Sequence, residues 1–411
     1  MKFLFCPLAS HGFVYPSIGI AQILKRRKHQ VAFVTDIAFS GILQQAGLER
    51  IPRTNQDGAS FQVGVWAKPI GVSMQIKHIQ YALDQFAPDV LVTHQLTLGV
   101  LIVGELYNLP ICILGGAAYL LPTSTSVLER PPISETEARL LWRYEEMMKL
   151  YNLNRQLWSL PSIHCNYRDT PLLGDLFLLQ SLPELEPDVD QLPEKVHLIG
   201  DCLWEPPVFD PDLMNWLNDA IASGEQIIYV QPGRSFGKPG FWPNLVEVLA
   251  NLPVRVVAVV SRMDSELGEI PQNFLVRDHI PQGLILPYAK AVISSGHTTT
   301  VLGAIKHGVP SLLIPNGSGT EEIAERCQTA GIAICLSPNH ITNQTIEQAV
   351  HQLLNCRQIQ QNSQVLQQAF SKVNGCEQAA DLLIKLAITS PKGKNHLQSQ
   401  VPSLKLVMNN Y

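Results

Sequence analysis

The sequence has no strong excess of basic residues, which would be typical of nucleic-acid-binding proteins, and its start does not have the pattern of a secretory signal. Its 411 residues carry 30 basic and 35 acidic side chains, a formal net charge of −5, and no dense basic run. A nucleic-acid partner needs a concentrated positive surface, so this balance argues against one. The N-terminal apolar stretch is too short for a secretory signal and lacks a cleavage-site pattern. We therefore expect a cytoplasmic protein.

Closely spaced cysteines and long apolar runs are also missing. None of the eight cysteines forms a C-x-x-C pair or stands at metal-ligand spacing, so buried, reduced thiols are expected. The acidic residues show no ligand spacing either, and no metal is expected. The most apolar region, residues 90–121, is interrupted by polar residues and by Pro110. It predicts strand, helix and strand within a core rather than a membrane span.

The sequence does have alternating strand and helix patterns. Apolar residues make up 46% and charged residues 16% of a chain long enough for two domains. Residues 2–8 and 30–35 are predicted strands that flank a helix over residues 17–28, which is a βαβ unit. The pattern recurs at residues 89–114, and a second series occupies residues 226–314. Parallel strands joined by helices predict doubly wound α/β sheets that bind ligands at their carboxyl ends.

The two series are separated by a proline-rich stretch, residues 201–211, which predicts a stiff linker. We expect a first Rossmann-like domain over residues 1–205 and a second over residues 206–390. Residues 391–411 are expected to form a loose tail. Two such domains that face one cleft suit a nucleotide-linked donor in one domain and an acceptor in the other.

Motifs spread along nearly the whole chain carry a family resemblance. The opening ASHGFVYPSIGIAQILKRRKHQVAFVTD resembles the first βαβ unit of family-1 glycosyltransferases, the UDP-glycosyltransferase and macrolide-glycosyltransferase group. HIPQGLILPYAKAVISSGHTTTVLGAIKHGVPSLLIPNGSGTEEIAERC is similar to the family's donor motif, YVQPGRSFG to its first C-domain loop, and LPEKVHLIGDCLWEPP to its approach to the linker. The resemblance implies a GT-B fold, in which the N-terminal domain binds the acceptor and the C-terminal domain binds a nucleotide sugar without metal.

The family's general base and the Asp that orients it are both replaced. The base position falls on Phe13, which cannot take a proton, and the Asp position falls on His94. His11 lies two residues before Phe13, and imidazole titrates near neutrality, so the resemblance suggests a rearranged catalytic pair of His11 and His94. Alternatively, both are polar structural residues and the pair is absent. Phe13, Trp66 and Tyr119 are expected to line an apolar acceptor site, although core packing would explain them equally well.

The donor diphosphate is expected at a helix N-terminus, where backbone N–H groups and the helix dipole favour anions. In an ungapped register Ser295 replaces the family's phosphate-binding His and His297 its second Gly. A one-residue insertion would instead keep Gly296 as that Gly. The predicted donor-binding residues of this turn are Ser295, Gly296, His297, Thr298, Thr299 and Thr300.

Two further segments are expected to contact the nucleotide. Gly233, Arg234 and Ser235 follow the first strand of the second series, and Arg234 offers a charge-assisted bond to the diphosphate. An exposed loop arginine without a ligand is the alternative. His279 stands where the family has the Trp that stacks on the base, and Gln282 keeps the position that meets the nucleoside.

The positions that contact ribose and sugar in the family are altered as well. Its ribose-contacting Glu falls on Gly303, and its sugar-binding Asp-Gln pair falls on Gly319 and Thr320. Glu321 follows directly, and a small shift would let Glu321 take the sugar-binding role beside Thr320. A solvated helix start with capping acids is the alternative interpretation.

The resemblance implies that a sugar moves from a UDP-linked or dTDP-linked donor to a hydroxyl of a small apolar acceptor, with inversion. The expected partners are the nucleotide sugar and the acceptor, and no separate cofactor is expected. The altered positions leave two alternatives open. One is a non-catalytic relative that activates a partner or binds a small molecule. The other is a GT-B enzyme repurposed as an isomerase or lyase.

Overall fold

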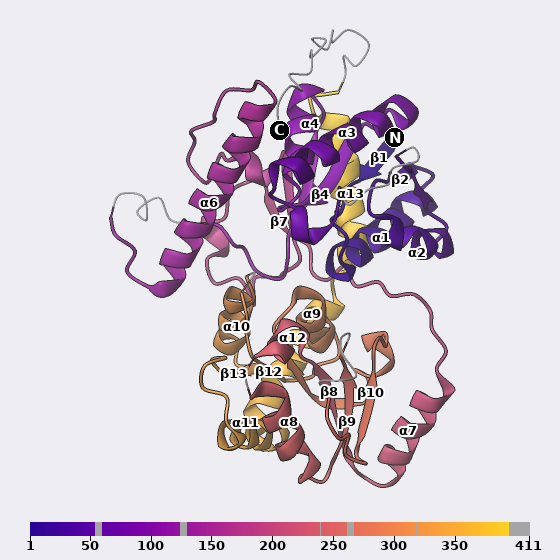
Figure 1. Cartoon of the computed structure of the whole chain (residues 1–411), viewed down its shortest axis with the longest axis vertical. Coiled ribbons are helices and arrows are strands. Elements are labelled where there is room, and N and C mark those ends of the chain that lie inside the picture. Colours follow the sequence, from indigo (N-terminus) through magenta and orange to yellow (C-terminus); the bar gives the residue numbers. More distant parts are fainter. Residues whose placement is uncertain (54–59, 124–129, 239, 261–266, 318, 394–411) are drawn as a thin grey trace.

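Two parallel sheets, each covered by helices, make up the protein (Figure 1). The computed structural model describes residues 1–53, 60–123, 130–238, 240–260, 267–317 and 319–393. The N-terminal sheet has seven strands in the order β3-β2-β1-β4-β5-β6-β7, and the second has six in the order β10-β9-β8-β11-β12-β13. This doubly wound arrangement confirms the predicted fold of two Rossmann-like domains.

The first domain is formed by the elements up to residue 198. They are β1 (Lys2–Phe5), α1 (His11–Arg26), β2 (Gln30–Phe33), η1 (Ile37–Phe39), α2 (Ser40–Gln45), β3 (Glu49–Arg50), η2 (Val63–Val65), α3 (Pro69–Phe86), β4 (Val90–His94), α4 (Leu98–Leu106), β5 (Ile111–Leu114), α6 (Glu135–Leu157), η3 (Pro171–Leu173), β6 (Leu176–Leu179), η4 (Val189–Gln191) and β7 (Val196–Leu198).

The remaining elements begin after the linker. They are α7 (Pro211–Ala222), β8 (Gln226–Gln231), η5 (Gly233–Gly237), α8 (Phe241–Ala250), β9 (Val254–Val259), β10 (Phe274–Arg277), η7 (Gln282–Leu284), β11 (Ala289–Ser294), α9 (Thr298–Lys306), β12 (Ser311–Leu313), α10 (Thr320–Thr329), β13 (Ala333–Cys335), α11 (Asn343–Asn355), α12 (Arg357–Ser371) and α13 (Gly375–Thr389). Among the described helices, none combines the length and apolarity that a membrane crossing requires.

Helix α1 begins six residues earlier than predicted. The Ser17 hydroxyl, expected to cap the helix, instead donates to the Phe13 carbonyl at 2.9 Å within it. Burial of the apolar face that starts at Val14 outweighs the helix-breaking tendency of Pro16. The first turn, with His11 and Phe13, therefore stands directly after the carboxyl end of β1.

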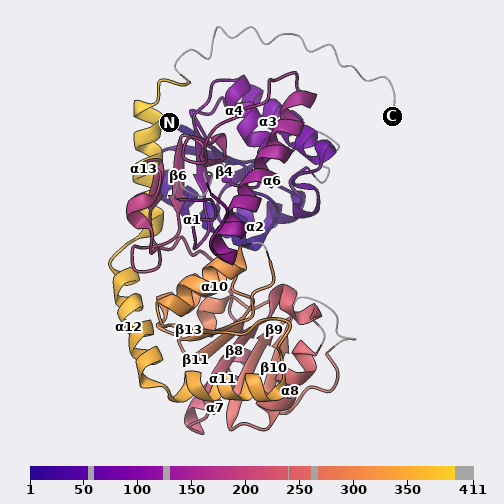
Figure 2. The same ribbon diagram turned by 90° about the vertical axis from the view of Figure 1, so that its left-hand side faces the viewer.

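The C-terminal helix α13 packs on the first domain (Figures 1 and 2). The predicted second domain, residues 206–390, includes this helix. α13 packs against α1 and β4, and its Ala379, Ala380 and Leu383 belong to the same core as α1. An ideal Cβ on Gly375 would lie 2.0 Å from the Asp201 carbonyl oxygen, so only glycine allows this contact between α13 and the linker. The chain thus crosses between the domains at two adjacent segments.

A core between the domains joins them. From the first domain it contains Ala117, Ala118, Leu120, Leu182 and Leu185. From the second domain it contains side chains of α9, β12, α10 and α12, among them Val301, Leu302, Ile323, Leu366 and Phe370. We call these residues the interdomain core. Because apolar burial favours contact, this core holds the carboxyl ends of the two sheets toward each other.

We predict that Gly375→Ala lowers the free energy of unfolding by about 1–3 kcal/mol, because the added methyl group must displace α13 from the linker. Gly64→Ala is the matched control, since its Cβ would have no atom within 4 Å. Urea denaturation of both variants provides the measurement. Equal stability of the two would show that α13 does not depend on this close approach.

Candidate active site

The candidate site lies between the carboxyl ends of the two sheets, where residues of both domains touch. The ring centroids of His11 and His279 are 5.5 Å apart with an interplanar angle of 28°. The Ala117 backbone N–H donates to the Thr298 hydroxyl oxygen at 3.2 Å. These contacts join the start of α1 and the segment after β5 to the loops after β10 and β11.

His11 is an exposed imidazole at the first position of α1. Besides His279, its ring contacts Tyr15 and Phe39, with centroids 5.0 and 5.4 Å away. Partial burial, followed by the nearby His279, lowers the pKa of His11 from its ordinary value of 6.5. The ring is therefore neutral at neutral pH and can accept a proton.

His94 lies at the end of β4 and is only 3% exposed. Its Nε2 donates to the Phe13 carbonyl oxygen at 3.0 Å, and its ring packs on that of Phe13 at 4.5 Å. Burial lowers the pKa of His94 to about 4, although hydrogen bonds to the backbone of Phe13 and Leu114 oppose the shift. His94 thus anchors the first turn of α1. The ring contacts given above for His11 are with His279, Tyr15 and Phe39, and those of His94 are with Phe13.

The three side chains expected to line the acceptor site lie in or against the first-domain core. Phe13 and Trp66 are partly buried, and Tyr119 is 1% exposed with its ring edge on Phe177. Among the described residues, the Tyr119 hydroxyl has no hydrogen-bond partner. Their acceptor-binding role stays a prediction.

The predicted donor turn precedes α9 as a compact group. Helix α9 begins at Thr298 after His297 at the N-cap position, and Gly296 has the left-handed φ of 80°. The Ser295 hydroxyl is buried, and within the described chain it has no hydrogen-bond partner. An ideal Cβ on Gly233 would lie 2.7 Å from that hydroxyl oxygen. Glycine at 233 therefore leaves room beside an unpaired donor at a helix N-terminus.

The other polar groups of this turn are engaged. The Thr300 hydroxyl donates to the Gln231 side chain, and the Thr299 carbonyl accepts from the Gln282 amide at 2.9 Å. The backbone of Arg234 and Ser235 lies in η5, whereas their side chains lie outside the described part of the structure. Their predicted bond to a diphosphate stays a prediction.

Gln282 faces α9 rather than an open nucleoside site. Its side chain is 8% exposed, and an ideal Cβ on Gly303 would lie 2.5 Å from its Nε2. The Gln282 amide thus fills the space that a side chain at 303 would need. His279, three residues earlier, is exposed, and its ring lies against that of His11. Its stacking on a base stays a prediction.

Glu205 is a site residue that the sequence interpretation missed. Its carboxylate accepts from the backbone N–H groups of Gln282 and Gly283, both at 2.8 Å, so the linker holds the loop after β10. Burial raises the pKa of Glu205, while the two backbone bonds and His279 oppose the shift. A lone acid in a proline-rich linker gives no local pattern from which this role could be predicted.

The residues expected to bind the sugar, Thr320 and Glu321, make hydrogen bonds within their own loop. The Thr320 hydroxyl donates to the Gly317 carbonyl at 2.7 Å, and Glu321 Oε1 accepts from the Gly317 N–H at 2.8 Å. Glu322 is fully buried and pairs with Arg143 of the first domain. Within the described residues, no group of His, Cys, Asp and Glu could hold a metal ion.

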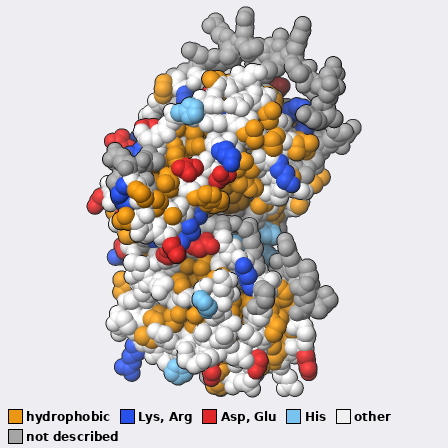
Figure 3. All heavy atoms as spheres, turned by 60° about the vertical axis from the view of Figure 1, so that its left-hand side comes forward, with side chains coloured by type: hydrophobic (Ala, Val, Ile, Leu, Met, Phe, Trp, Pro, Cys, Tyr) orange, Lys and Arg blue, Asp and Glu red, His pale blue; other side chains and the backbone are white. Residues whose placement is uncertain are grey.

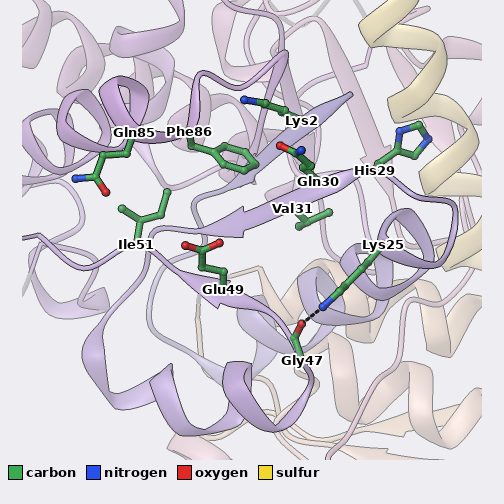
Figure 4. Close-up of a pocket in the computed structure, with 10 residues that line it drawn as sticks. All are labelled: Lys2, Lys25, His29, Gln30, Val31, Gly47, Glu49, Ile51, Gln85 and Phe86. Carbon is green, nitrogen blue, oxygen red and sulfur yellow. Dashed lines mark hydrogen bonds between the residues drawn. The ribbon is translucent and has the colours of Figure 1, made fainter.

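A hollow of about 470 Å³ lies at the opposite end of the N-terminal sheet (Figure 4). Its lining includes Lys2 and Gln30, which begin β1 and β2, together with Lys25 and Phe86. The Lys25 ammonium donates to the Gly47 carbonyl. Because ligands of such sheets bind at the carboxyl ends of the strands, this hollow is not the candidate active site.

Two Rossmann-like domains that face each other through their strand ends define the GT-B fold. The family described as erythromycin biosynthesis protein CIII-like, C-terminal domain, matches residues 244–384. The 4'-demethylrebeccamycin synthase of Lentzea aerocolonigenes is 24% identical over 90% of this chain and 96% of its own length. The PGL/p-HBAD biosynthesis rhamnosyltransferase of Mycobacterium bovis is 24% identical over 86% and 80%.

Solved structures have the same fold. The glycosyltransferase of kitacinnamycin has a TM-score of 0.71 at 20% identity and covers 93% of this chain and 98% of its own. The glycosyltransferase VinC, in complex with dTDP, has a TM-score of 0.71 at 16% identity over 95% and 100%. These matches confirm the resemblance to macrolide-type family-1 GT-B glycosyltransferases that the sequence motifs predict.

The low pKa of His94 predicts acid-sensitive stability. The unfolded imidazole takes up a proton near pH 6.5 and the folded one only near pH 4, so protonation favours unfolding. The contribution is present in full above pH 6.5 and is lost as the pH falls toward 4, by about 3 kcal/mol in total. Denaturant unfolding at several pH values should show that His94→Gln removes this dependence and that His340→Gln, at an exposed position, keeps it.

Proposed function

We propose that the protein transfers a sugar, with inversion, from a UDP-linked or dTDP-linked donor to a hydroxyl of a small apolar acceptor. The observation that carries the proposal is a pair of contacts between the domains. The neutral, exposed His11 contacts His279 of the second domain, and the anion-receptive helix start at Thr298 contacts Ala117 of the first. The names of similar proteins support the proposal. They include a rhamnosyltransferase, and a spinosyn rhamnosyltransferase solved with an aglycone and with thymidine diphosphate. A cytoplasmic location is part of the same proposal.

The donor diphosphate is proposed to bind at the start of α9. The first backbone N–H groups of a helix have no partner within it, and the helix dipole favours an anion there. The buried Ser295 hydroxyl, which has no partner in the described part of the chain, adds a donor, and Gly233 leaves the space beside it. The exposed His279 is suited to stack on the base.

His11 is proposed as the general base. Its neutral ring takes the proton of the acceptor hydroxyl while that oxygen bonds to the anomeric carbon and the bond from carbon to the phosphate oxygen breaks. The electron pair stays on the nucleoside diphosphate, whose added charge faces the N-terminus of α9. His94 is proposed to hold the α1 turn, because its Nε2–H is committed to the Phe13 carbonyl.

The two alternatives, a non-catalytic relative and a repurposed isomerase or lyase, are not favoured. Similar proteins include a named rhamnosyltransferase and a named glycosyltransferase, and the exposed His11 ring is accessible to an acceptor hydroxyl. Product mass separates the three outcomes. A gain of one sugar residue supports transfer, an unchanged acceptor mass with a new structure supports isomerisation, and no product supports a binding role.

We predict that His11→Gln lowers kcat by about 100-fold while the dissociation constant for the nucleoside diphosphate stays within about twofold of wild type. Steady-state rates and titration calorimetry measure the two effects, and His340→Gln is the control. In the wild type kcat/KM should fall on the acidic side with an apparent pKa below 6.5, because protonated His11 cannot act as a base. An unchanged kcat in His11→Gln would exclude this base.

Gly233→Ala should weaken binding of UDP or dTDP by about tenfold or more, since its Cβ enters the space beside the Ser295 hydroxyl. Gly237→Ala, in the same η5 turn with no atom within 4 Å of its Cβ, should bind as the wild type does. Titration calorimetry with both nucleotides provides the test. If the wild type binds neither nucleotide, the proposed donor class is wrong.

A further inference from the structure

The segment 115–121, which follows β5, is fixed at its base to the first domain. The Gly115 carbonyl accepts from the Gln180 side-chain amide at 2.8 Å, and the Gly116 carbonyl accepts from the Gln180 backbone N–H at 2.9 Å. We call residues 115–121 the bridging segment. From this base it extends to the second domain, where three kinds of contact hold it.

The first contact reaches the helix start proposed for the diphosphate. The Ala117 N–H donates to the Thr298 hydroxyl oxygen at 3.2 Å. An ideal Cβ on Gly116 would lie 2.7 Å from that oxygen, so a side chain at 116 would push the segment away. The positive end of the Ala117 amide dipole therefore faces the N-terminus of α9.

The second contact is a buried ion pair on Tyr119. Arg326 of α10 pairs with the fully buried Glu186 at 2.5 Å, and the Glu186 carboxylate accepts the Tyr119 N–H at 3.2 Å. The Arg326 guanidinium also donates to the Tyr119 carbonyl at 3.5 Å. The Arg326–Glu186 pair therefore binds both the N–H and the carbonyl of Tyr119.

The third contact is an ion pair on Leu120. Arg143 of α6 donates to both carboxylate oxygens of the buried Glu322 at 3.1 Å and to the Leu120 carbonyl at 3.3 Å. The Leu120 side chain fits against Gly319, whose ideal Cβ would lie 2.7 Å from it. On the face drawn in Figure 3, basic and acidic side chains gather at the boundary between the domains.

We propose that the bridging segment of the acceptor domain forms one wall of the nucleotide-sugar site, and that Arg143, Glu322, Arg326 and Glu186 are the positioning residues that hold it there. The inference rests on the proposed function. Each ion pair spans the two domains and also binds the backbone of the segment, so the four residues act on its position. The Ala117 N–H then holds the Thr298 hydroxyl oxygen at the helix start proposed for the diphosphate.

The chain offers a matched control for these pairs. Arg130 also belongs to the first domain and pairs with Glu137 at 3.0 Å near the start of α6. Both residues of this pair lie in one domain. Arg130→Gln therefore removes the same charge from a more exposed pair within one domain, away from the contacts of the bridging segment.

The test compares Arg143→Gln, Arg143→Lys and Arg130→Gln in the full chain. Arg143→Gln should raise the dissociation constant for UDP or dTDP, and KM for the donor sugar, by about tenfold or more, because charged hydrogen bonds are lost. Its kcat at saturating donor should stay within about threefold of wild type. Arg143→Lys should give an intermediate KM, and Arg130→Gln should match the wild type.

An Arg143→Gln variant that unfolds cooperatively and binds nucleotide as tightly as the wild type would overturn the proposal. If Arg143→Gln does not fold, Glu186→Gln, which keeps the shape of the side chain, takes its place with the same expected results. Hydrogen exchange of the Ala117 and Tyr119 amides supplies a second readout. Faster exchange in Arg143→Gln but not in Arg130→Gln supports positioning, and equal exchange overturns it.

Failure of the proposed function gives a different pattern. If the wild type binds neither UDP nor dTDP, the proposed donor class and the wall assigned to it are both overturned. The exchange rates still decide whether the ion pairs position the segment. If the wild type binds nucleotide and Arg143→Gln binds it equally well, the donor class stands and only the positioning inference is overturned.

Discussion

The contact between the domains depends on two carboxylates, Glu186 and Glu322, that are fully buried where the domains meet. A buried carboxylate is tolerated when cations and hydrogen bonds replace the lost water. Here Arg139 and Arg143 pair with Glu322, and Arg326 pairs with Glu186, in each case from the opposite domain. When the domains separate, both partners of each pair regain water, so the pairs contribute little net free energy to closure. They fix the geometry of contact, while the interdomain core supplies the attraction.

The position of the proposed base depends on residues at opposite ends of the chain. His94 binds the first turn of α1 through the Phe13 carbonyl, and α13 packs on the other side of the same helix. Arg27, at the end of α1, pairs with Asp381 of α13 at 2.5 Å. The C-terminal helix therefore supports the element that carries His11, although Gly375 stands 364 positions after His11.

Strand patterns and a helix start close after Ser294 could be predicted because each depends on local spacing. The start of α1 could not, since burial of Val14 against the sheet outweighs Pro16. The role of His94 depends on that start, because only a helix that includes Phe13 brings its carbonyl to the imidazole. Glu205 was missed because its partners lie 77 and 78 residues away, and no local motif marks them.

The altered positions compensate one another, which is an argument against a decayed site. His94 replaces the family's Asp, and its imidazole donates to the Phe13 carbonyl. Gly303 replaces the family's Glu, and the Gln282 amide fills that space and donates to a carbonyl of α9. Random loss would leave buried polar groups unpaired at a cost of about 1–3 kcal/mol each. Of these substituted positions, Ser295 has a hydroxyl without a partner among the described residues, and it stands at the helix start where an anion would satisfy it.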